Sequence, residues 1–228
     1  MAAEPLLAED SLELRRAVID TAQAMNEAGI NVNKTGNVSV RCCRGRHAGL
    51  LITPTGLGYE TLQAADLVFL RLADGRATGT RAPSSEWRFH LDIHRARPEL
   101  AAIVHTHSPS ATALACHGRG IPPFHYMVAA AGGADIRCAP YATFGTQALS
   151  DHALAALAGR KACLLAHHGV IACEASLPQA LALAIEVEHL ARMYLAACAL
   201  GEPPRLADDE MARVLAKFER YGQPGGGN

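Results

Sequence analysis

The amino-acid sequence predicts a layered α/β domain built on a mixed or mainly antiparallel sheet. Three observations support this prediction. The chain has 228 residues, half of them hydrophobic, which suits one large domain or two small ones. Apolar runs with strand character and amphipathic runs with helical spacing are mixed along the whole chain. Several strands follow one another without an intervening helix, which excludes strict βαβ alternation and favours antiparallel pairing.

The first elements are a helix and three strands. Residues 8–30 have helical spacing of apolar side chains; Asp10 or Ser11 can cap the start of this helix, and Gly29 ends it. The segments GNVSVR and GLLITPTG predict two short strands, separated by the polar turn at 44–47. The segment DLVFLRLADG predicts a third strand that runs into a turn.

A second helix follows over 84–98, capped by Ser84 or Ser85 and ended before Pro98. The later elements are, in order, a strand over 103–106, an alanine-rich helix after Pro109, two strands joined at HHG within 162–174, and helices over 177–200 and 208–220. Residues 123–146 contain three glycines and several aromatic residues, and they predict a long irregular stretch. Such structured loops often carry function.

The composition excludes several classes of protein. A net charge of −1 and an isoelectric point near 6.8 give no general attraction to nucleic acid or to anionic lipid. The mean hydropathy is +0.07, and no apolar run approaches the ~20 residues of a membrane span. We expect no secretory signal in MAAEPLLAED. Seven cysteines without a CxxC pair, Cys42 and Cys43 being the one close pair, indicate reduced thiols in a cytosolic protein. The tail GQPGGGN at 222–228 is expected to be disordered.

The segment AAIVHTHS at 101–108 is a candidate metal site. Alternation along a strand places His105 and His107 on the same face, close enough for both imidazoles to bind one ion. Histidine nitrogen is a typical zinc ligand. The structural alternative is a pair of histidines that bond to backbone groups at the end of a strand.

Four other short stretches combine turn residues with polar groups. Hydroxyls, an amide and free backbone N–H groups suit a phosphate, although each stretch alone also reads as a turn or a helix cap. The residues are Gly36 and Asn37, Thr55 and Gly56, Ser84, Ser85 and Glu86, and His167 and His168. A rival metal site is the row Glu86, His90 and His94, which lie on one helix face. Tyr126 is either a proton donor or acceptor, or a core tyrosine with a satisfied hydroxyl.

Eight segments in order resemble one known family. They are GNVSVR, LITPTG, PSSEWRFH, VHTHS, IPPFHYMVAAAGG, CAPYATFGT, LLAHHGVIACE and KFERYG. They are similar to the class II sugar-phosphate aldolase family, which includes fuculose-phosphate aldolases, and residues 125–146 resemble that branch most. The resemblance implies a three-layer α/β/α catalytic domain over 1–221, with a central, mainly antiparallel sheet. It also implies a cyclic C4 homotetramer with active sites shared between subunits.

The resemblance also assigns roles. It implies one zinc ion per chain, bound by His105, His107 and His168, with Glu86 as a resting ligand that acts as acid–base once substrate displaces it. It selects His168 over His167, which spacing leaves open. It places the substrate phosphate against Asn37, Thr55, Gly56, Ser84 and Ser85. It makes Tyr126 a catalytic tyrosine near the aldehyde, and Tyr221 a C-terminal tyrosine that closes a neighbouring subunit's site.

The implied reaction is the reversible cleavage of a ketose 1-phosphate between C3 and C4. With L-fuculose 1-phosphate the products are dihydroxyacetone phosphate and L-lactaldehyde; close deoxyketose 1-phosphates give related short aldehydes. Zinc takes the place of a lysine Schiff base in stabilising the developing negative charge. Such an enzyme is cytoplasmic and has no nucleic-acid or membrane partner. The alternatives are a 4-epimerase or a dehydratase on the same scaffold, and a non-catalytic adducin-like module, which need not retain metal ligands.

Overall fold

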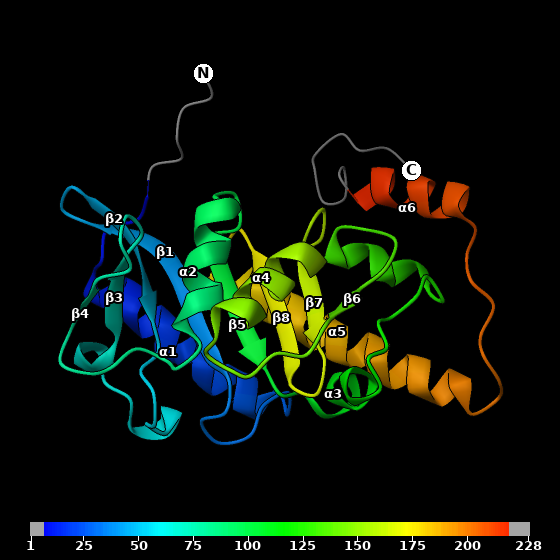
Figure 1. Cartoon of the computed structure of the whole chain (residues 1–228), viewed down its shortest axis with the longest axis horizontal. Helices are drawn as coiled ribbons and strands as arrows, with labels where there is room; N and C mark the ends of the chain where they lie inside the picture. Colours follow the sequence, from blue (N-terminus) through cyan, green and yellow to red (C-terminus); the bar gives the residue numbers. More distant parts are fainter. Residues whose placement is uncertain (1–6, 219–228) are drawn as a thin grey trace.

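The centre of the computed structural model, which describes residues 7–218, is one eight-stranded sheet (Figure 1). The strand order is β4-β3-β2-β1-β5-β8-β7-β6, and every neighbouring pair is antiparallel except the parallel pair of β6 and β7. The prediction of a mainly antiparallel sheet is therefore confirmed. The strands are β1 Asn37–Arg44, β2 His47–Ile52, β3 Val68–Arg71, β4 Ala77–Thr78, β5 Ala102–Thr106, β6 Arg137–Ala139, β7 Ala162–Leu165 and β8 Gly169–Glu174.

Helices cover both faces of the sheet, which gives the expected three layers. On one face, α1 (Leu12–Glu27), α3 (Pro109–Cys116) and α5 (Leu177–Cys198) bury the larger apolar core. On the other face, α2 (Trp87–Ala96) and α4 (Gln147–Ala156) pack on Ile103, Cys163 and Ile171. Three short 3₁₀ helices and a last α-helix complete the fold: η1 Tyr59–Thr61, η2 Ala64–Asp66, η3 Tyr126–Ala131 and α6 Asp208–Phe218.

The starts of the helices differ in how their free N–H groups are satisfied. Ser11 caps α1, its Oγ accepting from the N–H of Leu14 at 3.1 Å. Pro109 occupies the first turn of α3, where no N–H is needed. Glu86 is the N-cap of α2, so the prediction that Ser84 or Ser85 caps this helix is wrong. The Oγ of Ser84 instead accepts from the N–H of Glu86 at 3.3 Å.

The stretch expected to be irregular is partly regular. It contains η3 and the edge strand β6, and α4 begins directly after it, capped by Thr146. We did not predict these three elements. The sequence of this stretch shows no clear helical or strand periodicity. Burial of its apolar side chains stabilises it instead, since those of η3 pack in the same core as α5. The prediction of one uniformly irregular loop is therefore wrong.

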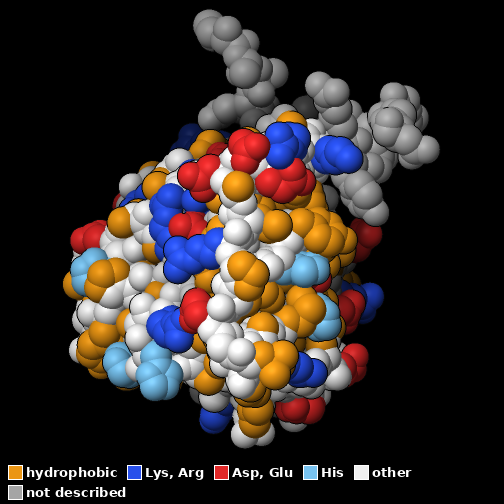
Figure 2. All heavy atoms as spheres, turned by 90° about the vertical axis from the view of Figure 1, so that its right-hand side faces the viewer, with side chains coloured by type: hydrophobic (Ala, Val, Ile, Leu, Met, Phe, Trp, Pro, Cys, Tyr) orange, Lys and Arg blue, Asp and Glu red, His pale blue; other side chains and the backbone are white. Residues whose placement is uncertain are grey.

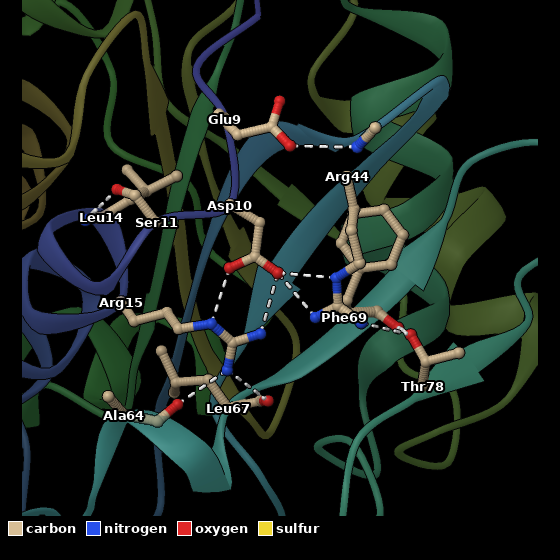
Figure 3. Close-up of polar contacts among 11 residues, drawn as sticks. Glu9, Asp10, Ser11, Leu14, Arg15, Arg44, Ala64, Leu67, Phe69 and Thr78 are labelled. Atoms are coloured by element: carbon tan, nitrogen blue, oxygen red, sulfur yellow. Dashed lines mark hydrogen bonds and ion pairs between the residues drawn. The ribbon is translucent and has the colours of Figure 1, made fainter.

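Asp10 ties the first helix to the sheet instead of capping it. Figure 3 shows its carboxylate between the guanidinium groups of Arg15, on α1, and Arg44, on β1. Arg15 also donates to the backbone oxygens of Ala64 and Leu67. This network holds together the incoming chain, α1, the end of β1 and the segment around η2.

The end of the molecule near α6 and β6 is shown in Figure 2, where apolar side chains lie among groups of both charges. All seven cysteines are free thiols, in agreement with the sequence-based expectation. Within residues 7–218, no helix combines the length and apolar character needed to cross a membrane. Tyr221 and the glycine-rich tail lie outside the described residues, so their predicted roles stay predictions.

Candidate active site

His105 and His107 lie at the end of the central strand β5 and point to the same side. Their Nε2 atoms are 3.1 Å apart, as the alternation of the strand predicts. The Nδ1 of His105 lies 2.8 Å from the backbone oxygen of Val170 on β8. This bond requires a proton on Nδ1, so the lone pair of Nε2 faces the cluster, as in a metal-binding histidine.

His168 enters the same cluster from the turn between β7 and β8. His167 takes a left-handed backbone conformation, with φ of 55°, which allows this tight turn. Gly169 lies so close to β5 that a Cβ atom would be 2.3 Å from the backbone oxygen of Thr106. This glycine lets the turn approach the strand, and the ring centroids of His168 and His105 are 4.9 Å apart.

Glu86 supplies the one carboxylate of the cluster. Its Oε2 lies 3.1 Å from Nε2 of His105, and its Oε1 lies 3.0 Å from Nε2 of His168. Ligand atoms of these residues and of His107 all lie within 4.8 Å of one another. Sequence spacing alone had left the third histidine open, and the structure brings His168, not His167, into the cluster.

The electrostatics of this cluster suit a divalent cation. Burial raises the pKa of Glu86, but the electrostatic effect of the neighbouring His105 and His168 outweighs it and holds the pKa well below its usual range. Burial, with the neighbouring His105 and His168, lowers the pKa of His107 to about 4, so its imidazole is neutral at pH 7. Oε1 of Glu86 is buried and accepts no hydrogen bond from the described residues. A cation bound by the carboxylate and three imidazoles would satisfy these atoms together.

The rival row of Glu86, His90 and His94 does not form a metal site. Both histidines are fully buried between α2 and β1, where they bond to Ser39 and, through His90, to Asn37. Equal spacing on a helix places the three residues on one face. Glu86, however, precedes the helix as its N-cap, so its side chain turns toward β5 instead.

The predicted phosphate residues fall into two groups. The loops that carry Thr55 and Ser84 are paired by backbone bonds, Thr55 N–H to Ala82 O at 3.2 Å and Ser84 N–H to Thr53 O at 3.0 Å. The exposed hydroxyls of Thr55 and Ser85 are free to meet a ligand, whereas Ser84 is buried.

Asn37 has both of its polar side-chain atoms hydrogen-bonded inside the protein, to Glu86 and His90. Lys34 was missed by sequence reasoning. Its Nζ donates to the backbone oxygen of Gly56 at 2.9 Å, which places a cation beside the loop.

A cavity of about 260 Å³ opens onto the cluster. Ser85, Glu86, His107 and His168 line it together with Thr35, His167, Tyr141, Ala142 and Phe144. Tyr126 is not among these residues. It is half exposed at the start of η3 and lines a separate cavity of about 600 Å³ against α6. Within a single chain, therefore, Tyr126 and the cluster of Glu86 and three histidines line different cavities.

Comparisons with known proteins agree with this geometry. Residues 16–195 match the family model described as Class II Aldolase and Adducin N-terminal domain. A Rhodospirillum rubrum protein named 5-methylthioribulose-1-phosphate/5-deoxyribulose-1-phosphate aldolase is 54% identical over 92% of this chain and 93% of its own length. An Escherichia coli L-fuculose phosphate aldolase is 50% identical over 92% of this chain and 96% of its own.

The fold is also similar to that of a solved L-fuculose 1-phosphate aldolase. The TM-score is 0.87 at 37% identity, and the match covers 93% of this chain and 98% of the other. The match to the family model extends from α1 to near the end of α5, so it includes all four residues of the cluster. The chain belongs to the class II aldolase family.

Proposed function

We propose that the protein is a zinc-dependent aldolase that cleaves a ketose 1-phosphate between C3 and C4, reversibly, to dihydroxyacetone phosphate and a short aldehyde. One observation carries the proposal: His105, His107, His168 and Glu86 converge at a cavity whose rim holds hydroxyl groups for a phosphate. Its seven free thiols support action in the cytoplasm.

The proposed substrate is L-fuculose 1-phosphate or a close deoxyketose 1-phosphate. The exposed rings of Tyr141 and Phe144 line the cavity and suit the apolar end of a deoxy sugar. The relatives described above divide between L-fuculose phosphate and the 5-methylthio- and 5-deoxyribulose phosphates. These substrates differ by small groups, which a pocket discriminates by only about 1–3 kcal/mol, so the substrate panel below includes all three.

Proton transfer is the part of the reaction that Glu86 performs. When bound, zinc would supply Lewis-acid stabilisation for the negative charge left on the ketose oxygens as the C3–C4 bond breaks. The electron pair of that bond stays with C3, and the carboxyl group of Glu86 delivers a proton there; in the reverse direction the carboxylate removes it. The low pKa of Glu86 keeps the resting carboxylate ionised, which is the form that removes the proton in the condensation direction. In the cleavage direction Glu86 must first take up a proton, and the C4 hydroxyl, which loses one as the aldehyde forms, balances the proton added at C3.

The phosphate is held at the paired loops. Hydroxyls of Ser85 and Thr55 and the backbone N–H of Gly56 would donate to its oxygens, and Lys34 adds a positive charge beside Gly56. Ser84 supports the loop from below by accepting from the N–H of Glu86.

Tyr126 and Tyr221 complete the site from a neighbouring subunit in a cyclic tetramer. Tyr126 is half exposed and shares a cavity with α6, not with its own histidine cluster, and Phe218, the last described residue of α6, precedes Tyr221 by three positions in the sequence. The apolar side chains exposed at this end of the molecule suit contact with another subunit (Figure 2). In this arrangement Tyr126 would handle the proton on the C4 oxygen.

The main test is a coupled assay for release of dihydroxyacetone phosphate from the three ketose 1-phosphates, with and without chelator. We expect dihydroxyacetone phosphate to be released, the chelator to abolish this release, and added zinc to restore it. A 4-epimerase would convert its substrate without release, a dehydratase would lose water, and an adducin-like module would do nothing. Any of these outcomes overturns the proposal.

Glu86→Gln tests the assigned proton transfer. We expect the variant to bind a phosphorylated inhibitor but to lose solvent deuterium exchange into dihydroxyacetone phosphate. Exchange at the wild-type rate would exclude Glu86 as the base.

Subunit sharing is tested by mixing two inactive chains, Glu86→Gln and a chain truncated before Tyr221. Hybrid oligomers should regain part of the activity. Absence of regained activity after confirmed subunit exchange contradicts a shared site.

A further inference from the structure

A line of buried polar side chains leads from Glu86 into the layer between the sheet and α2. Asn37 Nδ2 donates to Oε2 of Glu86 at 2.9 Å, and Asn37 Oδ1 bonds to Nε2 of His90. The Nδ1 of His90 lies 2.7 Å from Oγ of Ser39, and the same Oγ lies 2.9 Å from Nε2 of His94. Ser39, His90 and His94 have no exposed surface, and Asn37 is 3% exposed.

Which group donates and which accepts in each of these hydrogen bonds follows from the carboxylate of Glu86, where the line ends. An ionised Glu86 only accepts, so the amide of Asn37 must present its nitrogen there and its oxygen to His90. His90 therefore carries its proton on Nε2 and accepts at Nδ1 from the hydroxyl of Ser39. That hydroxyl has one proton to give, so His94 must donate to it from Nε2.

Both histidines are neutral in this arrangement. Burial, together with the neighbouring His94 and His105, lowers the pKa of His90 well below its usual value. Burial and the charge of Arg41 lower the pKa of His94 to about 3. A single set of protons thus satisfies all four bonds.

The location of the line points to a role beyond packing. Burying four polar side chains is unfavourable unless their polar atoms are paired, and among these four only Nδ1 of His94 has no hydrogen-bond partner within residues 7–218. Apolar residues fill the same layer elsewhere, as Phe89 and Ile93 do. The hydrogen bonds end on the one carboxylate of the metal cluster. The line uses the Oδ1 atom and one of the two amide N–H groups of Asn37.

We propose that Ser39, His90 and His94 are positioning residues that act through Asn37 to orient the carboxylate of Glu86. Oε2 of the carboxylate is held on Asn37 and faces His105, and Oε1 faces His168. Such fixed orientation is what a proton-transferring group requires. The kinetic meaning of the line rests on the proposed function; its bond directions do not.

The bond directions are tested by nitrogen NMR of the full-length protein labelled with ¹⁵N-histidine. We expect His90 and His94 each to be the neutral tautomer with the proton on Nε2. Ser39→Ala should shift the Nδ1 resonance of His90, which loses its donor. A proton on Nδ1 of His90 in the wild-type protein would overturn the proposal, whatever the enzyme's activity.

The effect on Glu86 is tested by kinetics in a matched pair of serine variants. Ser39→Ala should lower both kcat and the solvent exchange into dihydroxyacetone phosphate by about 5- to 10-fold, with KM and zinc content unchanged. The control is Ser150→Ala. Ser150 is equally buried and also bonds to a side chain of α2, Asp92 at 2.7 Å, but that bond does not lead to Glu86. The control should lose comparable thermal stability and retain kcat.

If Ser39→Ala does not fold, a second pair of variants, both at His94, tests the same proposal. His94→Gln places an amide N–H near the position of Nε2 and should recover most of the exchange rate that His94→Met loses. Equal exchange rates in these two variants, or an unchanged kcat in folded Ser39→Ala, would show that the line only packs. If the wild-type protein itself shows no exchange, the proposed function fails, and the NMR result alone decides the bond directions.

Discussion

Replacing Asp10 with asparagine should measure how strongly the first helix is tied to the sheet. Arg15 donates to the Asp10 carboxylate at 2.6 and 2.9 Å, and Arg44 donates to it at 2.8 and 2.6 Å (Figure 3). The Asp10 side chain is 4% exposed, against 15% for Arg15 and 40% for Arg44. Asp10→Asn removes the charge that neutralises both guanidinium groups but preserves the shape of the side chain.

The expected loss is about 3 kcal/mol of the free energy of unfolding, the lower end of the range for breaking a buried ion pair. The lower end applies because Arg15 retains its bonds to Ala64 and Leu67, and because Arg44 is partly solvated and retains Thr78. In a chain of this size, about 3 kcal/mol corresponds to a fall in Tm of roughly 6–12 °C.

The assay is thermal unfolding followed by circular dichroism at several pH values. Burial raises the pKa of Asp10, but the bonds from Arg15 and Arg44 outweigh it, so the folded-state pKa is lowered. Stability from a carboxyl with a lowered pKa is present above about pH 4 and is lost as pH falls through the folded value. The Tm difference between wild type and variant should therefore be full at pH 7 and shrink below pH 4.

The matched control is Glu99→Gln, which removes a carboxylate from the exposed pair with Arg97 and should cost less than about 1 kcal/mol. A Tm of Asp10→Asn within about 2 °C of the wild type at pH 7 would refute this estimate.

Three further predictions concern the site. His107→Ala should lower turnover by roughly 10³-fold or more and sharply reduce bound zinc; full zinc occupancy by elemental analysis would contradict the assignment of this ligand. Gly169→Ala should destabilise the protein by about 2–3 kcal/mol in denaturant titration and weaken zinc binding, because its methyl group would meet the backbone oxygen of Thr106. Gly58→Ala is the control for added bulk, since Gly58 has a φ of −68° and a Cβ atom there would meet only the flexible end of the Glu60 side chain. Lys34→Met should raise KM for the phosphorylated substrate about 3- to 5-fold with kcat unchanged. If the difference in KM between wild type and variant were the same at high salt as at low salt, a charge contact between Lys34 and the substrate would be contradicted.

Short-range patterns predicted the parts of the site that depend on one element. The alternation of β5 places His105 and His107 on one side, and strand geometry requires this in any fold. Ser11 and Gly29 set the ends of α1 for similarly local reasons, a side-chain cap and a left-handed backbone. The family resemblance selected His168 over His167, which spacing left open, and it assigned Glu86 to the histidine pair of β5, whereas helical spacing had grouped Glu86 with His90 and His94.

Tertiary structure decided which polar groups meet. Helical spacing groups Glu86 with His90 and His94, yet Glu86 points to β5 while the two histidines point to β1. The register of the sheet makes the difference: Asn37 lies opposite His105, so the first residue of β1 reaches Glu86 and hydrogen-bonds to it. The periodicity of a helix or strand determines on which of its faces a side chain lies. The residue that this side chain contacts, however, belongs to another strand or helix that is distant in the sequence. The sequence by itself therefore determined most of the helices and strands and the histidine pair, whereas η3, β6, α4 and the packing of α2 on the sheet, which orients the carboxylate, depended on the tertiary structure.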